Sequence, residues 1–222
     1  MSTPEIHLRT LFSLDNDGRI LGTREANQRP GPKFMLVRGM SEVVWAVRAD
    51  VAQDVAEELD GLAREEPPVS DLRGDPVHID RYLSLLEGKV SAGPAFVFPE
   101  VIARPLGTEL IHDVRLLDRH FSGWEAGEIP ASSPIVALIE QGHAVSACFC
   151  ARRSDTTAEA GLETAVKYRG RGFGPRVAAG WALAVRASGR TPLYSTSWSN
   201  VSSLAVARKL GLTVYASSWS IV

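Results

Sequence analysis

The chain has 222 residues, of which 45% are hydrophobic and 23% charged, and its formal net charge is −2. This is the composition of an ordinary globular protein, and it excludes disordered and fibrous classes. No apolar run approaches the ~20 residues that cross a bilayer, and the first ten residues lack the apolar stretch of a signal peptide, so we expect a cytoplasmic protein.

The cysteines and histidines predict neither a disulfide nor a metal site. Cys148 and Cys150 are one residue apart, so a strand would place both on one face, where they are poorly placed to bond to each other. We expect buried free thiols rather than a redox or nucleophilic pair. The five histidines lack ligand-like spacing, and basic residues balance acidic ones along most of the chain, so neither a metal nor a nucleic acid is expected.

The sequence of residues 1–106 predicts a small N-terminal α/β region, and it contains no recognisable catalytic or binding motif. Apolar residues at strand or helix spacing, with prolines and glycines between them, indicate its elements. These are a strand at 43–47, a helix for which Asp50 is the expected N-cap, a loop at 64–76, a short helix at 78–87 and a strand at 95–98. The segment Pro105 to Gly107 marks the boundary to a second region, 107–222.

From residue 107 onward the pattern predicts an α/β domain with a mixed sheet. After a short helix, the order from residue 135 onward is three strands, a helix, a strand, a helix and a last strand. The expected elements are a short helix at 113–121, strands at 135–139 and 144–152 joined by a turn at Gln141 and Gly142, a strand at 159–166, a helix at 175–188, a strand at 193–197, a helix at 202–210 and a strand at 213–221.

A glycine-rich loop, Arg169 to Gly174, joins a predicted strand to the start of a predicted helix. Helix N-termini present unpaired amides and a positive dipole end, and glycine lets a phosphate approach the backbone. Arg169 and Arg171 add positive charge, although such a loop by itself is also typical of a tight connection. A P-loop is excluded because it needs Lys and then Ser or Thr where this chain has Pro175 and Arg176. A Rossmann fingerprint is excluded because no acidic residue follows at the required position near the end of the next strand.

Two motifs of this region resemble those of the GNAT superfamily of N-acetyltransferases. The loop from Arg169 to Gly174 is similar to the family's signature of Gln or Arg, two variable residues, Gly, one variable residue, and Gly or Ala. The segment that begins at Asn200 is similar to the family's ending motif, with the same spacing to Lys209 and Gly211. The run 192–198 further resembles a bacterial branch with an extra N-terminal region. The resemblance covers 107–222 well and the first hundred residues loosely.

The resemblance implies a GNAT-like fold whose central sheet splays between the strand ending near Thr164 and the strand at 193–197. It also implies acetyl-CoA as co-substrate, an amine as acceptor, and no metal. The pantetheine arm would pair with the backbone of the first of these strands, the pyrophosphate would rest on the loop amides, and Asn200 would bond to the arm from the opposite side. The implied cofactor-binding residues are Leu162, Glu163, Thr164, Arg169, Gly170, Arg171, Gly172, Phe173, Gly174, Asn200 and Ser203.

Acetyl transfer to an amine needs a base, because an alkyl amine with a pKa near ~10 is mostly protonated at about pH 7. Glu159 and Glu163 are the candidates, since strand alternation places both on one face. Glu159 is the preferred base because Glu163 is nearer the cofactor arm. The alternative is that both are exposed or ion-paired carboxylates without a catalytic role.

The family's usual general acid is a tyrosine in the last helix, and Ala207 stands at that position. Tyr194 is a candidate substitute on the neighbouring strand, as are Ser195 and Ser197, although Tyr194 could equally be a core residue. The favoured function is therefore an N-acetyltransferase that acts on an amine of a small molecule or peptide. The missing tyrosine supports the alternative of a non-catalytic acyl-CoA-binding or sensing module, and a purely structural α/β domain would require both motifs to be coincidental.

Overall fold

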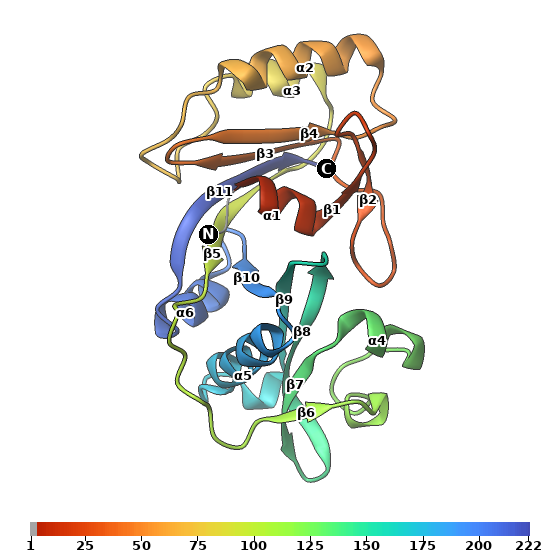
Figure 1. The fold of residues 1–222 in the computed structure, drawn as a ribbon, viewed down its shortest axis with the longest axis vertical. Coiled ribbons are helices and arrows are strands. Elements are labelled where there is room, and N and C mark those ends of the chain that lie inside the picture. Colours follow the sequence, from red (N-terminus) through yellow and green to blue (C-terminus); the bar gives the residue numbers. More distant parts are fainter. Residues whose placement is uncertain (1–3) are drawn as a thin grey trace.

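A computed structural model describes residues 4–222, apart from the side chain of residue 126. Over these residues the chain builds a two-stranded ribbon and a nine-stranded mixed sheet with the order β4-β3-β11-β5-β10-β9-β8-β7-β6 (Figure 1). The expected α/β fold with a mixed sheet is therefore confirmed. The strands are β1 (Phe12–Leu14), β2 (Ile20–Thr23), β3 (Phe34–Gly39), β4 (Val43–Val47), β5 (Val90–Val97), β6 (Glu109–Ile111), β7 (Ile135–Glu140), β8 (His143–Arg153), β9 (Thr157–Thr164), β10 (Thr191–Ser195) and β11 (Thr213–Ile221).

Six α-helices and three short 3-10 turns complete the described part of the chain. The helices are α1 (Pro4–Leu11), α2 (Gln53–Glu65), α3 (Ile79–Leu85), α4 (Ile129–Ser132), α5 (Phe173–Ala187) and α6 (Val201–Lys209), and the 3-10 turns lie at Val114–Leu116, Ala126–Glu128 and Val166–Tyr168. Within the described residues, none of these helices has the length and apolar character needed to cross a membrane.

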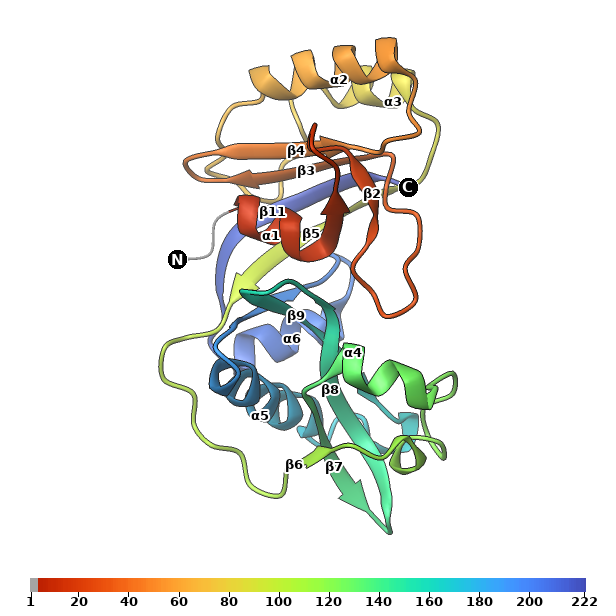
Figure 2. The same ribbon diagram turned by 45° about the vertical axis from the view of Figure 1, so that its right-hand side comes forward.

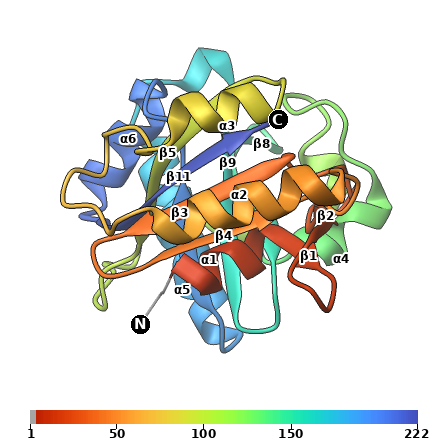
Figure 3. The same ribbon diagram turned by 90° about the horizontal axis from the view of Figure 1, so that it is seen from above.

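Helices cover both faces of the sheet around β3, β4 and β11. On one face, α2 and α3 lie side by side (Figure 3), and they bury Leu59 and Tyr82 against Trp219 of β11. On the other face, α1 lies across the strands (Figure 2) and buries Leu8 with Met35 of β3. Each strand therefore alternates between two apolar interiors, as a strand buried on both faces must.

Strand β5 joins the two halves of the chain within this sheet. It comes from the first hundred residues, yet it lies between β10 and β11 and is antiparallel to both. Phe96 and Phe98 contribute to the same apolar interior as Trp181 of α5. The division of the chain at residue 106 remains a prediction, and the sheet continues across it.

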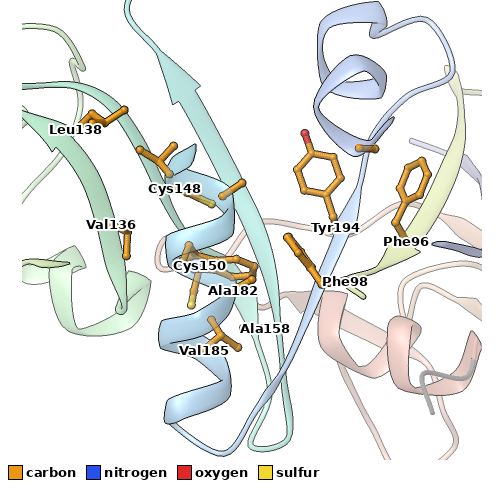
Figure 4. Packing of buried hydrophobic residues seen from close by; sticks show 14 of the residues in the cluster. Phe96, Phe98, Val136, Leu138, Cys148, Cys150, Ala158, Ala182, Val185 and Tyr194 are labelled. Atoms are coloured by element: carbon orange, nitrogen blue, oxygen red, sulfur yellow. The ribbon is translucent and has the colours of Figure 1, made fainter. Parts of the chain in front are cut away.

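The strands β7, β8 and β9 form an antiparallel set, and α5 packs on one face of it. Figure 4 shows Cys148 and Cys150 on the side of β8 that faces α5, near Ala182 and Val185. Both cysteines are buried and free, as expected. Burial raises the pKa of both thiols, that of Cys150 to about 11, so they remain protonated packing groups.

The parallel strands β9 and β10 separate part-way along their length. Their pairing runs from Thr157 and Thr191 to Glu159 and Leu193, after which β9 continues to Thr164 without β10. On its other edge β9 stays paired with β8 as far as Thr164. The expected splay of the sheet is therefore present, and it leaves one edge of β9 open.

Several expected element boundaries were wrong for identifiable reasons. Asp50 does not cap α2, which begins after Ala52, because its carboxylate instead accepts a hydrogen bond of 2.6 Å from Arg48. The helix expected at 113–121 is only a 3-10 turn. Helix α5 begins two residues before Pro175, because Gly172 takes the N-cap position with φ at 77° and proline is tolerated in a first turn.

Candidate functional site

A cleft of about 810 Å³ lies where β9 and β10 separate. Its walls come from the end of β9, the glycine-rich loop, the end of β10 and the first turns of α6. Most of the residues predicted to bind the cofactor line this one space, as does Tyr194. They are Leu162, Glu163, Thr164, Arg169, Gly170, Gly172, Phe173, Gly174, Asn200 and Ser203.

The glycine-rich loop leaves open space at the N-terminus of α5. Gly170 and Gly172 have φ angles of 78° and 77°, which strongly favour glycine. A Cβ atom at either position would meet no other atom within 4 Å, whereas one at Gly174 would lie 3.6 Å from Leu162 and Val206. The loop therefore presents bare backbone at a helix N-terminus, a surface on which an anionic phosphate group fits.

The two arginines of the loop lie differently. Arg169 lines the cleft, and its Nε donates a hydrogen bond of 3.1 Å to the carbonyl oxygen of Thr164. Arg171 does not line the cleft, because its guanidinium stacks over the ring of Tyr168 at 5.0 Å. Of the two predicted cationic contacts, only Arg169 is brought to the cleft wall.

The start of α6 contributes two side chains to the cleft wall beside β10. Asn200 is the N-cap of α6, and its Oδ1 accepts a hydrogen bond of 3.0 Å from the backbone N–H of Ser203. This bond leaves the amide NH₂ group of Asn200 as the donor for a ligand. The hydroxyl of Ser203 lies 2.5 Å from that of Tyr194, so these two groups form a polar pair on the cleft wall.

Glu159 lies at the closed end of the cleft, behind its wall. The residue is buried, and one oxygen of its carboxylate accepts a hydrogen bond from Ser195 while the other accepts one of 3.0 Å from Arg152. Arg152 in turn contacts Glu25 at 2.5 Å. Ser195 lines the cleft although Glu159 does not, so Glu159 reaches this space through the serine hydroxyl.

Glu163 lies at the open end of the same strand face. It lines the cleft, and partial burial raises the pKa of its carboxyl. Gly161 stands between the two glutamates, where a Cβ atom would lie 2.4 Å from the ring of Phe149. The two carboxylates thus share a face, as strand alternation predicts, but one is ion-paired and buried and the other faces the solvent-filled cleft.

Comparison with known proteins identifies the family of this region. Residues 118–218 match the family model described as GNAT acetyltransferase. This region of the chain matches a GNAT acetyltransferase domain, and the resemblance expected from the sequence is confirmed there. Comparison with curated protein sequences gives no match.

Several solved structures resemble this chain in fold. A GCN5-related N-acetyltransferase-like protein from Streptococcus suis has a TM-score of 0.50 and 15% identity, over 86% of this chain and 85% of that one. A GNAT-family acetyltransferase from Colwellia psychrerythraea has a TM-score of 0.49 and 14% identity, over 94% of this chain and 80% of that one. A GNAT-family protein from Novosphingobium aromaticivorans has a TM-score of 0.48 and 18% identity, over 60% of this chain, which spans 64% of that one. At such identities the likeness concerns the fold.

Ala207 stands at the position in α6 where the family usually carries a tyrosine, and the hydroxyl of Tyr194 from β10 lies near it. Ala207 is buried on α6, one helical turn after Ser203, which pairs with Tyr194 from β10. The ring of Tyr194 packs in the core beside Phe96 (Figure 4), so it is both a core residue and a cleft residue. Burial raises the pKa of Tyr194 to about 12.

Sequence analysis missed two basic residues that line the GNAT cleft. Lys209, in the last turn of α6, is part of the motif that begins at Asn200, and its spacing could have indicated a contact. His120 comes from the connection before α4 and lies edge-on to Tyr168, with ring centroids 5.6 Å apart. No sequence pattern marks His120, because only the tertiary fold brings it to the cleft. Within the described residues, no group of three or more His, Cys, Asp or Glu side chains gathers as a metal site would require.

Proposed function

We propose that the chain transfers an acetyl group from acetyl-CoA to the amine of a small molecule or peptide. The observation that carries this proposal is the cleft itself. One wall is the unpaired edge of β9, and the wall next to it is the bare glycine backbone at the start of α5. An extended amide-bearing arm fits the first wall and a pyrophosphate fits the second, and acetyl-CoA carries both groups.

In this proposal the backbone of Leu162, Glu163 and Thr164 pairs with the arm, and the loop from Arg169 to Gly174 holds the phosphates. Asn200 and Ser203 contact the arm from α6. Arg169 and Lys209 add positive charge to the same space. The acetyl group is then directed to the closed end of the cleft, where β9 and β10 meet at Glu159 and Leu193.

The proposed base is Glu159, acting through Ser195. The hydroxyl of Ser195 donates to Glu159 and lines the cleft, so it can accept a proton from the amine while it passes its own proton to the carboxylate. The neutral amine then attacks the thioester carbonyl, a C–N bond forms, the C–S bond breaks with its electron pair on sulfur, and the nitrogen releases its second proton to solvent as the amide forms. Glu163 is the alternative base, because its pKa is raised and it lines the cleft directly.

Tyr194 is proposed to stabilise the departing thiolate as a hydrogen-bond donor. Its pKa of about 12 lies above the ~8.5 of an ordinary thiol, so full proton transfer from the phenol to the thiolate is unfavourable. Solvent then supplies the proton to the thiolate. Because its pKa is raised, this tyrosine is proposed to act as a hydrogen-bond donor and not as a general acid.

The test is release of free CoA thiol from acetyl-CoA with a broad panel of amines, together with calorimetric binding of acetyl-CoA. Turnover with any amine supports the proposal. Binding of acetyl-CoA without turnover of any amine would favour a non-catalytic acyl-CoA-binding or sensing module, for which Ala207 is the motivation. The absence of binding would exclude both functions.

A further inference from the structure

A second cavity of about 340 Å³ lies on the opposite face of the sheet from α5. It is built largely by the N-terminal region, for which the sequence gives no role. Leu11 and Phe12 line it on the side of α1, and residues of the segment from Glu25 to Pro32 line its opening. Its floor is formed by Ser91 and Gly93 of β5 and by Ser218 and Ser220 of β11.

The two cavities meet at the end of β10. Ser195 and Thr196 line both of them. Tyr194 points to the α5 side, where it packs in the core, and by strand alternation Ser195 points to the other face, toward Glu159. A group bound in the second cavity therefore reaches the closed end of the cleft beside Ser195.

A chain of alternating charges runs from the mouth of this cavity to that meeting point. At the mouth is Arg29, whose side chain is 74% exposed and whose Nε lies 3.7 Å from Glu25. Glu25 contacts Arg152, and Arg152 contacts Glu159, whose side chain is only 4% exposed. Arg29 is the most exposed member and, within residues 4–222, has this one long ion pair alone, so it retains its capacity to bind an anion.

We infer that the second cavity binds the acetyl acceptor and that the acceptor is a small amine carrying a carboxylate, of about amino-acid size. This inference rests on the proposed function. The amine end lies at Ser195 and the carboxylate end at Arg29. Arg152 is held by two shorter ion pairs, so Arg29 is the lining cation, among the described residues, that is placed to bind an anionic group of the ligand.

The size and chemistry of the cavity agree with such an acceptor. Its volume lies at the low end of the ~300–1,000 Å³ range of small-molecule pockets, which favours a small ligand over a peptide tail. Its serine hydroxyls offer hydrogen bonds to a polar molecule. The reaction balances without a further reagent, since the protonated amine loses one proton to the Ser195–Glu159 pair before attack and a second to solvent as the amide forms, while CoA leaves as the thiolate.

The test compares each amino acid with the amine that its decarboxylation would give, measuring CoA release from acetyl-CoA. We expect turnover with one or more amino acids and at least 10-fold lower kcat/KM for the matching amines. The variant Arg29→Gln should raise KM for the amino acid by about 10-fold or more, with kcat and acetyl-CoA affinity nearly unchanged, because a charge-assisted hydrogen bond is lost. Arg9→Gln is the matched control, since Arg9 pairs with Glu5 on the exposed face of α1 and does not line the cavity.

A second measurement keeps the site testable if no amine is acetylated. Amino acids that bind the cavity should raise the melting temperature of the wild type and of Arg9→Gln, but not of Arg29→Gln. Turnover confined to amines without a carboxylate, or equal KM values for Arg29→Gln and Arg9→Gln, would overturn the inference and leave the acetyltransferase proposal standing. A panel that gives neither turnover nor a melting shift also overturns it, and acetyl-CoA binding alone would then point to the sensing module.

Discussion

The two cavities that meet at Ser195 offer different chemical groups to a ligand. The cleft between β9 and β10 offers mainly backbone, namely an unpaired strand edge and glycines with no side chain. The cavity under α1 offers side chains, namely serine hydroxyls and a row of ion pairs. Backbone groups persist when side chains change, so the first space suits an invariant donor molecule. Substitutions can alter the second space without disturbing the first, so the acceptor can vary while the chemistry stays the same.

The largest expected effect breaks the backbone recognition of the cleft. We expect Gly172→Asp to abolish acetyl-CoA binding, at least 100-fold in Kd, because its carboxylate would occupy and repel the phosphate site at the start of α5. Calorimetry with acetyl-CoA measures the loss. Gly189→Asp is the control, because Gly189 has the same left-handed backbone at the other end of α5, with φ at 81° and open space around it. Equal loss in both variants would mean that backbone strain, and not the anion site, is responsible.

The next effect concerns the carboxylate at the meeting point of the two cavities. Glu159→Gln should lower kcat by about 10²-fold or more with little change in acetyl-CoA affinity, since it removes the proton acceptor but keeps the shape. Glu163→Gln is the matched control on the same strand face. A dead Glu163→Gln beside a fully active Glu159→Gln would assign the base to the cleft carboxylate. A folded, soluble Glu159→Gln is required, because the substitution leaves Arg152 without one of its two ion pairs.

A smaller effect is expected from the hydroxyl that borders the cleft. Tyr194→Phe should reduce kcat by about 10-fold, the value of one hydrogen bond, rather than the 10²-fold or more of a lost general acid. It should also lower the unfolding free energy by about 1 kcal/mol through the loss of the bond to Ser203. Steady-state kinetics and urea unfolding separate the two losses. A fall in kcat above 100-fold would show that Tyr194 is a true proton donor despite its raised pKa.

The smallest effect is a pH dependence of the unfolding free energy that comes from a buried histidine of α1. His7 of α1 is fully buried against Tyr215 and Ser218, and burial lowers its pKa from 6.5. A lowered pKa means that the unfolded chain binds the proton first, so this contribution to stability is complete above pH 6.5 and declines as the pH falls toward the folded-state value. We expect the unfolding free energy to drop with a slope of at most about 1.4 kcal/mol per pH unit from this group.

Urea unfolding at pH 7.5 and pH 5.5 measures this decline. The variant His7→Gln should show a smaller loss between the two pH values than the wild type, because glutamine keeps a polar partner for Tyr215 but does not titrate. The carboxylates of both proteins contribute equally and cancel in the comparison. An identical loss in both would show that His7 does not titrate in this range.

The parts of the molecule that were predictable from sequence are those whose signals are local. The loop from Arg169 to Gly174, the motif that begins at Asn200 and the alternation of Glu159 with Glu163 are each marked by residues close together in the sequence, and the structure places them as that spacing predicts. The ion pair between Glu25 and Arg152 spans 127 positions in the sequence, and no local pattern records such a contact. The sequence predictions also lack α1, β1, β2, β3, β6 and α4, since most of these are short elements in segments without clear periodicity and give weak signals.

The position of β5 has a consequence for how the protein reaches its native state. During synthesis, residues 90–97 are made well before β10 and β11, the two strands between which they pair. Until those strands emerge, this apolar segment has unsatisfied amides and carbonyls along both edges, a condition that invites pairing with other chains. Sheet closure must wait for β11, so we expect slow folding dominated by distant contacts and a dependence on protein concentration during refolding.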